Sequence, residues 1–457
     1  MNLRITRNIE EKARFENHPK VTRGGASAGD VPLCLAHRLF RAIIERGRPL
    51  PHGGPGGTSM RKVDLTNFKV ATSETARKIN RQITLNLLRR HQPMSRADLA
   101  RRSGLQRSTV SAIIDQLIEE GWVTEGAIGR VPRGRRPRFL HLNAERAGII
   151  GVDLRPETTT VGLAGLDARF VSQTVWPTPR EPEQFIRELS ASVAQIRSEH
   201  PRIVCEGIGV SLPGRVDASG RLIFAPNLGW RDVELKAQLE ASIGLPVALD
   251  NAANACALSE LWFGHHPDHL KHLIAVAVSE GIGVGLLLNG QLVHGATAMS
   301  GEFGHVSIDA EGPLCSCGNR GCWERFASNA AAVRYYVDSG GEGDASNGRA
   351  PLRFDDILRR ADEGDTRAID ALARQGRYLG IGLATLTTGL APELIVIVGD
   401  VTSAWDRVGP FVMEEVRRRS LPRANTRIVP SDRATQPRLR GAVTLVVQQH
   451  FGAHVVA

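Results

Sequence analysis

The sequence predicts an α/β protein that begins with a winged helix-turn-helix domain and continues with a larger effector domain of two lobes. The first observation is charge: residues 1–150 carry 28 Lys and Arg against 13 Asp and Glu, whereas residues 151–457 carry 30 against 35. The second is a change of pattern near residue 148, where amphipathic helices give way to buried strands. A basic front on a mildly acidic body indicates a polyanion-binding module joined to a different domain.

Length and composition set the broad class of the protein. A chain of 457 residues is long enough for two or three domains with buried cores. No apolar run approaches the roughly 20 residues that a membrane span needs, and the N-terminus lacks the apolar core of a secretory signal. We therefore expect a cytoplasmic protein without a membrane partner. Six cysteines are too few for a disulfide scaffold, and a reducing compartment would keep them as thiols.

Residues 1–60 show no sustained periodicity and end in the Pro/Gly-rich stretch "RPLPHGGPGGTSM". We expect this segment to be a disordered extension. Well-patterned sequence begins directly after Met60, which is therefore a candidate for the true translation start. The predicted domains are the DNA-binding domain at residues 61–147 and the effector domain at residues 148–457.

Three helices are expected in the order of a helix-turn-helix, with a glycine turn between the second and the third. Ser95 is the expected N-cap of the second helix, and Asp98 at its third position completes a capping box. That helix ends at Gly104, whose freedom at positive φ suits a tight turn. The first helix starts near residue 73 and stops before Pro93. Its predicted apolar face consists of Ile79, Ile83, Leu87 and Leu88.

The third helix has the pattern of a recognition helix. Its predicted buried face consists of Val110, Ile113, Ile114, Leu117 and Ile118. This leaves polar residues exposed at the start of the helix, where they can reach base edges in the major groove. Gln106 and Arg107 carry donors suited to purines. The predicted DNA-contacting residues of this helix are Gln106, Arg107, Ser108, Thr109 and Ser111.

The following stretch, "WVTEGAIGRVPRGRRPRFLHL", predicts two short strands around a loop that is rich in arginine. It has the pattern of the wing of a winged helix. The arginines could lie along phosphates or enter a narrow minor groove, and we predict DNA contacts for Arg133, Arg135 and Arg136. The alternatives are a plain helical bundle followed by a hairpin, and a loop that is merely solvated.

The effector domain shows two similar series of elements. Apolar strands at 148–154, 159–165 and 169–176 precede a helix at 182–198, and a strand follows near residue 204. A similar series restarts at "HLIAVAVSEGIGVGLLLNGQLVHG" and closes with a strand at 393–400. This pattern predicts a duplicated fold of two lobes with a cleft between them.

The segment "GEFGHVSIDAEGPLCSCGNRGCWE", residues 301–324, places three cysteines within eight positions, ten residues after His305. From the spacing alone the cluster could be a metal site, a disulfide or a coincidence. Cys315 and Cys317 are too close together for easy pairing, which disfavours the disulfide.

These motifs together resemble the ROK family of sugar kinases and sugar-responsive repressors. The resemblance rests on "GVSLPGRVD", "APNLGW", "LPVALDNAANACALSE", "SEGIGVGLLLNG", "GEFGH" and "CSCGNRGCWE", and it covers residues 61 to about 450. It implies a ribonuclease H-like (actin/hexokinase-type) effector domain with a sugar bound between its lobes. It also implies a homodimer or homotetramer, and two-fold operators of double-stranded DNA mirror two-fold proteins.

The resemblance further implies a metal site and a sugar site. The residues that match the family's structural zinc ligands are His305, Cys315, Cys317 and Cys322. Three thiolates and one imidazole make a closed tetrahedral site, so the expected cofactor, Zn²⁺, would be structural. The residues that match the family's sugar contacts are Asn251, Glu302, His305 and Glu324, with Asn227 of "APNLGW" added.

The sequence departs from the family's kinases at the general base. The kinases carry a catalytic aspartate directly after the asparagine of this motif, whereas "LDNAAN" has Ala252 there. Alanine cannot accept a proton from the attacking sugar hydroxyl. Asp250 lies two residues back, roughly 6–7 Å away in an extended chain, which is too far to substitute. No catalytic residue is therefore predicted.

Three further departures lie on the nucleotide side. The glycine-rich first phosphate loop (DxGGT) is "DLRPE", in which Arg155 is bulky and Pro156 has no N–H to offer. The second loop places Glu280 where it would repel phosphate. The third, "VGD", has Asp400 in place of a glycine.

These changes predict a sugar-responsive DNA-binding repressor built on a disabled kinase, not an enzyme. Two alternatives stay open. The chain could be an active ATP-dependent sugar kinase with an added DNA-binding domain, or a repressor controlled by a protein partner.

Overall fold

A computed structural model describes residues 73–128, 138–143, 147–264, 266–267, 270–296, 299–341, 352–421 and 425–451. All of these lie in one compact unit, Lys69–Ala457. The predicted extension at 1–60 and the wing residues Arg133, Arg135 and Arg136 fall outside the described residues. No helix in the described part of the chain is both long and apolar enough to cross a membrane.

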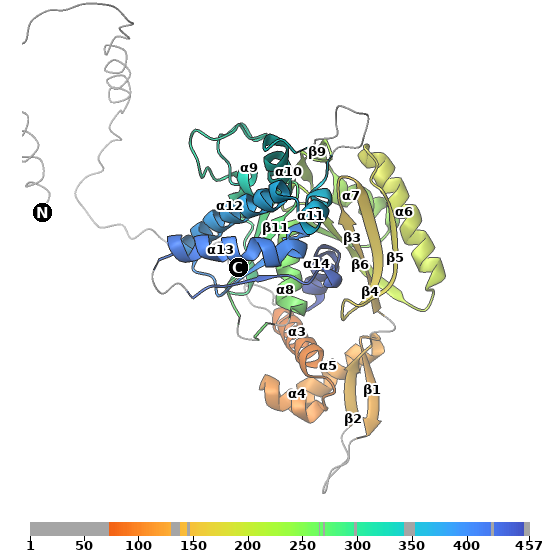
Figure 1. Cartoon of the computed structure of the whole chain (residues 1–457). Coiled ribbons are helices and arrows are strands. Elements are labelled where there is room, and N and C mark those ends of the chain that lie inside the picture. Colours follow the sequence, from red (N-terminus) through yellow and green to blue (C-terminus); the bar gives the residue numbers. More distant parts are fainter. Residues whose placement is uncertain are drawn as a thin grey trace, which may run out of the picture. The chain divides into compact units, whose positions relative to one another are not determined.

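The N-terminal part is the predicted helix-turn-helix with a two-stranded antiparallel sheet (Figure 1). Ser95 caps the second helix, and the capping box with Asp98 is present as predicted. Gly104 ends that helix with φ 73°, in the left-handed region. The elements are α3 (Ser73–His91), α4 (Arg96–Ser103), α5 (Arg107–Glu119), β1 (Val123–Ile128) and β2 (Arg138–Leu142).

The predicted apolar face of the first helix is partly wrong. Leu88 is fully buried, but Ile83 is 38% exposed, and α3 instead buries Thr84 and Leu85. The reason is that α3 packs on two partners, because it contacts both the helix-turn-helix core and helix α14 of the effector domain. A single apolar stripe in the sequence cannot describe a helix held from two sides.

The first lobe of the effector domain has a five-stranded sheet of order β10-β6-β3-β4-β5, and helices α6 and α7 cover one of its faces. A small three-stranded sheet adjoins it. The strands are β3 (Ala147–Leu154), β4 (Thr158–Gly165), β5 (Phe170–Pro177), β6 (Val204–Leu212), β7 (Arg215–Val216), β8 (Leu222–Ala225), β9 (Trp230–Val233) and β10 (Val247–Asn251). The helices are α6 (Pro182–Glu199) and α7 (Leu235–Ile243).

The second lobe has a five-stranded sheet of order β13-β12-β11-β14-β15, packed against the helices that follow it in the chain. The strands are β11 (Leu273–Val278), β12 (Ile282–Leu288), β13 (Gln291–Leu292), β14 (Leu394–Gly399) and β15 (Arg427–Pro430). The helices are α9 (Glu324–Ala327), α10 (Asn329–Asp338), α11 (Phe354–Asp362), α12 (Thr366–Leu390) and α13 (Trp405–Arg419). Short 3₁₀ turns lie at Glu302–His305, Asp400–Ala404 and Arg433–Thr435.

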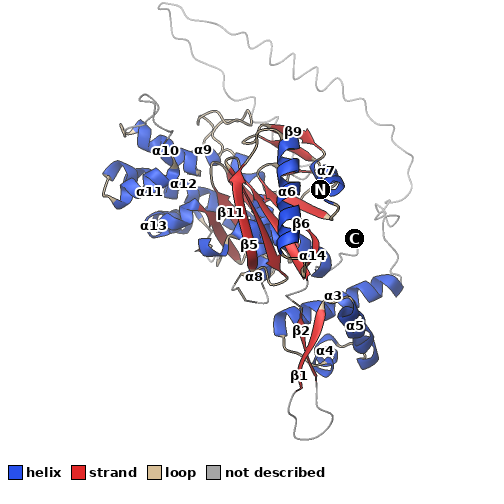
Figure 2. Ribbon diagram, turned by 90° about the vertical axis from the view of Figure 1, so that its right-hand side faces the viewer, coloured by secondary structure: helices blue, strands red, loops and turns tan. Residues whose placement is uncertain are grey.

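The two sheets repeat one topology. Counted along the chain, the strands of each lobe lie in the order 3-2-1-4-5, with the first three antiparallel and the last two parallel. The predicted duplication is therefore confirmed. Helices α8 (Ala252–Phe263) and α14 (Pro437–Phe451) pack on each other, α14 against the first sheet and α8 against the second (Figures 1 and 2).

Candidate functional site

The predicted base-contacting residues lie at the start of α5. Gln106 is the N-cap of this helix and Arg107 its first residue, and both are exposed together with Ser108. Thr109 and Ser111 are half-buried. The opposite face of α5 is anchored in the core by Val110, Ile114 and Leu117. The fold thus presents a polar helix N-terminus to solvent, as a recognition helix requires.

Arg96 was not singled out from the sequence, yet it ties this region together. Its guanidinium contacts Asp115 of α5 at 2.7 Å and Glu125 of β1 at 3.1 Å. Glu125 also accepts a hydrogen bond from Arg138 of β2 at 2.8 Å, and this bond lowers the pKa of the glutamate. The recognition helix and the base of the predicted wing are therefore held in one ion-pair network. The charged residues of this network lie on four different elements, so their spacing in the sequence did not predict the network.

The four residues of the His/Cys motif come together in space. The ligand atoms of His305, Cys315, Cys317 and Cys322 all lie within 4.8 Å of one another. His305 Nδ1 is 3.6 Å from Cys315 Sγ, and Cys317 Sγ is 3.6 Å from Cys322 Sγ. The four side chains could hold one metal ion.

Burial separates the three thiols. It raises the pKa of Cys315 and raises that of Cys322 to about 12. Burial also opposes ionisation of Cys317, but hydrogen bonds from the backbone of Asn319 and from the thiols of Cys315 and Cys322 together outweigh it and lower the pKa of this thiol. A metal that binds here must displace protons from the two buried thiols, so its affinity should fall at acid pH.

Two predicted sugar-binding carboxylates flank the same histidine. Glu302 Oε2 lies 3.8 Å from His305 Nε2, and Glu324 Oε1 lies 3.5 Å from His305 Nδ1. Glu324 also accepts a hydrogen bond from the thiol of Cys315 at 3.1 Å. The two nitrogens of His305 therefore face different neighbours, Nδ1 the cysteine cluster and Nε2 Glu302.

Asn251 and Glu324 both lie close to β12 or to Gly281, the residue before it. A methyl group on Gly281 would come within 2.7 Å of a carboxylate oxygen of Glu324, and one on Gly283 would lie 3.8 Å from the amide oxygen of Asn251. A side chain at Gly281 would therefore displace the carboxylate of Glu324. The 3₁₀ turn Glu302–His305 also contacts β12, so four of the five predicted sugar-binding residues lie around this strand and the residue before it.

Asn227 is the fifth predicted sugar-binding residue. It lies in the turn between β8 and β9 and lines a separate cavity of about 620 Å³ together with Pro156 and Arg180. Among the described residues it makes no hydrogen bond to the other four. Its assignment as a sugar contact stays a prediction.

His294 and Asp250 form a pair that the sequence did not reveal. His294 Nε2 lies 2.8 Å from Asp250 Oδ2, and this hydrogen bond raises the pKa of the histidine. The other oxygen of Asp250 accepts from the Asn251 backbone at 2.7 Å and from Asn254 Nδ2 at 2.9 Å. Both oxygens of Asp250, two residues before Ala252, are thus engaged.

In the segment that the sequence matched to the first phosphate loop, Arg155 pairs with a carboxylate two residues before it. Its Nε donates to Asp153 Oδ2 at 2.8 Å, while Arg438 of α14 donates to Oδ1 at 2.8 Å. Burial of Asp153 opposes its ionisation, but the two guanidinium groups outweigh burial and lower its pKa. Arg155, at the position that the resemblance matches to a glycine of the kinases' first phosphate loop, therefore neutralises a buried carboxylate.

Negative charge gathers beside this loop. Glu280 is exposed, yet desolvation of its carboxyl group, with repulsion from Glu157 and Asp400, raises its pKa. Asp400 is paired with Arg433 at 3.4 Å. Such a carboxylate cluster opposes the approach of a polyphosphate.

Comparison with known proteins identifies the family. Residues 149–449 match the ROK family, and residues 83–125 match the MarR family. The chain belongs to the ROK family. The DNA-binding region that precedes the ROK domain makes it a ROK-family transcriptional regulator with a MarR-type helix-turn-helix.

Both repressors and sugar kinases are among the proteins similar to this chain. The xylose repressor of Bacillus spizizenii is 30% identical over 387 residues, which are 84% of this chain and 98% of the repressor. A solved ROK-family transcriptional regulator, a homologue of E. coli Mlc, has the same fold, with a TM-score of 0.71 at 24% identity and coverage of 83% of this chain and 99% of its own. A ROK glucokinase from Streptomyces griseus, solved with glucose and AMPPNP, has a TM-score of 0.58 at 29% identity and covers 65% of this chain and 98% of its own.

We predict that replacing Glu280 by glutamine raises the melting temperature at pH 7. A carboxyl group whose pKa is raised by folding costs stability once it is ionised. The gain should shrink as the pH falls through the raised pKa towards the ordinary value of 4.5. Calorimetry as a function of pH measures this. Glu311→Gln, at another exposed carboxylate that does not adjoin Glu157 and Asp400, is the matched control and should change little. A lower melting temperature of Glu280→Gln at pH 7 would contradict the electrostatic account.

Proposed function

We propose that this protein is a sugar-responsive transcriptional repressor whose ROK domain binds a sugar without phosphorylating it. One observation carries the proposal: a helix-turn-helix and a ROK cleft share one chain, and the cleft has Ala252 in place of the general base. Similarity to a xylose repressor over most of the chain supports control of carbohydrate genes and a monosaccharide effector. The active form would be a homodimer or homotetramer on a two-fold DNA operator.

Three features support the loss of phosphoryl transfer. Ala252 cannot take a proton from a sugar hydroxyl. Asp250, two residues away, already accepts three hydrogen bonds through both of its oxygens. Arg155 and Arg438 neutralise Asp153, and Glu280 carries negative charge to the place where phosphates would pass.

The sugar would bind between Asn251, Glu302, His305 and Glu324. Carboxylates accept hydrogen bonds from sugar hydroxyls, while an amide or an imidazole can both donate and accept. Asn251 uses its side chain in part for the fold, because it donates to the carbonyl of Gly214 and accepts from the N–H of Ala253. The hydrogen-bonding capacity that remains to it would face the ligand.

The proposed metal is structural Zn²⁺, held by His305, Cys315, Cys317 and Cys322. Tetrahedral bonds of about 2.3 Å to sulfur and about 2.0 Å to nitrogen separate two sulfurs by about 3.8 Å and a sulfur from a nitrogen by about 3.5 Å. The observed separations of 3.6 Å for both kinds of pair fit this set. When bound, the metal would fix the loop, and His305 would keep Nδ1 on the cluster and Nε2 towards Glu302 and the sugar.

An active kinase is the second candidate, since Asp153 is retained at the end of β3 and the ROK glucokinase shares the fold of this domain. Consumption of ATP by the native protein in the presence of a monosaccharide would establish it. Control by a protein partner is the third candidate. A cytoplasmic protein that shifts DNA binding, where no sugar does so, would establish it.

We predict about one zinc per chain in the purified protein and its loss in Cys317→Ser. Binding free energy at such a site is folding free energy, so the variant should melt lower by roughly 2–4 °C for each kcal/mol lost. Metal analysis and calorimetry measure both quantities. Cys205→Ser, at a thiol outside the cluster, is the matched control and should keep its zinc. A native protein without zinc, or a Cys317→Ser protein that retains it, would refute the assignment.

We predict that Arg107→Ala weakens binding to a DNA duplex selected by the native protein from a random library by about 1–3 kcal/mol. Binding to unrelated DNA should change little, because the residue is assigned to base edges. The double variant Arg135→Ala/Arg136→Ala should instead weaken binding to all sequences and flatten the salt dependence. Fluorescence anisotropy at several salt concentrations separates these effects. Equal losses on selected and unrelated DNA for Arg107→Ala would remove it from the base contacts.

We predict that one monosaccharide of a panel containing D-xylose, D-glucose and N-acetyl-D-glucosamine changes the affinity for the selected duplex by roughly 5- to 150-fold. Glu302→Gln should abolish this change and leave sugar-free DNA binding near native, because the residue lies outside the DNA-binding domain. Glu311→Gln, on the same loop, should keep the response. If no sugar has an effect, the sensor assignment fails.

A further inference from the structure

Helix α8 begins beside the proposed sugar site and ends at the DNA-binding domain. Its N-cap is Asn251, and it runs for 12 residues to Phe263. At 1.5 Å per residue the helix is about 18 Å long. Figure 1 shows the end of α8 next to α3, the first helix of the DNA-binding domain. This inference rests on the proposed function and concerns how the two sites communicate.

The N-terminal end of α8 is tied to groups that a sugar would contact. Asn251 Oδ1 caps the helix by accepting from the Ala253 N–H at 2.8 Å, and its Nδ2 donates to the carbonyl of Gly214 at 2.7 Å. Asp250, the preceding residue, is bonded to His294 of the second lobe. A ligand that hydrogen-bonds to Asn251 would therefore act directly on the position of the first turn of α8.

The middle of α8 is packed too tightly to bend when its first turn is displaced. Nine consecutive residues, from Ala252 to Glu260, are buried. A methyl group on Gly285 of β12 would overlap the carbonyl of Ala253, and one on Gly441 of α14 would overlap that of Ala255. With backbone against backbone on both sides, displacement of one end should be passed to the other, because packed interiors have little free volume.

Arg89 of the DNA-binding domain contacts the C-terminal end of α8. Arg89 of α3 donates to the carbonyl oxygen of Trp262 at 3.1 Å, and its guanidinium carbon lies 4.5 Å from the centre of the indole ring. Two contacts from one side chain fix both the backbone and the ring of Trp262. A guanidinium stacked on tryptophan is a favourable geometry for this interaction.

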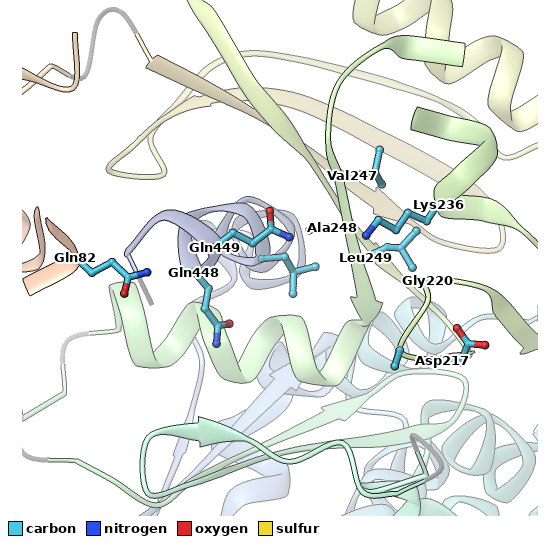
Figure 3. A pocket seen from close by; sticks show the side chains of 11 residues that line it. Gln82, Asp217, Gly220, Lys236, Val247, Ala248, Leu249, Gln448 and Gln449 are labelled. Atoms are coloured by element: carbon cyan, nitrogen blue, oxygen red, sulfur yellow. The ribbon is translucent and has the colours of Figure 1, made fainter. Parts of the chain in front are cut away.

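Gln82, in the middle of α3, borders a cavity. This cavity of about 460 Å³ lies between α3, α14 and the first lobe. Figure 3 shows Gln82 of α3 near Gln448 and Gln449 of α14 among the residues that line this cavity. The last turn of α3 thus contacts α8 through Arg89, while its middle packs on α14 and adjoins this cavity. A shift of Trp262 would therefore reach α3 through Arg89.

We infer that α8 couples the sugar cleft to the DNA-binding domain, and that Trp262 and Arg89 are the positioning residues at its output end. Sugar binding acts on Asn251, α8 moves as a rigid body, and the Arg89–Trp262 contact carries the movement into α3. Neither residue belongs to the proposed sugar site or to the proposed DNA contacts. Their removal should uncouple the two sites without abolishing either.

The test compares Arg89→Ala and Trp262→Ala with the native full-length protein. Anisotropy gives the affinity for the selected duplex with and without the most effective sugar of the panel, and calorimetry gives the affinity for that sugar. We expect both variants to bind sugar and sugar-free DNA within about 3-fold of native, while the 5- to 150-fold effect of sugar on DNA affinity falls towards 1. Arg90→Ala removes the same charge from the next residue of α3, which is exposed, and should keep the full effect.

Conservative variants guard against loss of structure. Trp262→Phe keeps an aromatic face and the backbone acceptor, and Arg89→Lys keeps the charge without the planar guanidinium. Both should retain part of the response. Because coupling is reciprocal, the affinity for sugar measured on DNA-saturated protein should change by the same factor as the affinity for DNA.

The outcomes separate the two proposals. If the native protein responds to sugar and all four substitutions leave the response intact, α8 is not the coupling element and the inference is overturned, while the proposed function stands. If Arg90→Ala loses the response as fully as Arg89→Ala, the specific contact is overturned in favour of general charge. If no sugar affects DNA binding by the native protein, the proposed function fails, and this inference fails with it.

Discussion

Two helices packed between two sheets are the constraint on which the rest of this molecule depends. Helices α8 and α14 approach β12 and β6 so closely that a methyl group on Gly285 or Gly209 would overlap the helix backbone. Each lobe could build its own sheet, but the shared core between the sheets forms only when both helices are in place. The cleft, the ion pairs of its nucleotide side and the contact with the DNA-binding domain all rest on these two helices.

The chemistry of the cleft follows from where charge is neutralised. On the nucleotide side, Asp153 is buried between Arg155 and Arg438. Both guanidinium groups are therefore paired with a carboxylate of the protein itself. On the opposite side, Glu302 and Glu324 flank a histidine whose other neighbours are thiols. One side is thus closed by internal ion pairs and the other keeps polar groups that can serve a neutral, hydroxyl-rich ligand. This asymmetry favours a sensor over a kinase.

Much of the local structure could be read from spacing. The capping box of Ser95 and Asp98, the turn at Gly104 and the buried face of α5 were predicted because they depend on neighbours within a few residues. The two strand series and the metal-ligand spacing were equally visible, and family resemblance supplied the ribonuclease H-like fold. The buried face of α3 was predicted only in part, because the sequence did not show that the helix has a second partner.

The sequence by itself determined which elements form and which residue types they carry; the tertiary structure decided what those residues meet. Arg438 reaches Asp153 across 285 positions, and Arg89 meets Trp262 across 173. Asn227 lines a cavity together with Pro156 and Arg180, which its motif did not indicate. The physical reason is that periodicity and capping are local properties of the backbone, whereas ion pairs and helix-end contacts depend on how distant elements pack. The cost of burying a charge then selects the partners that neutralise it.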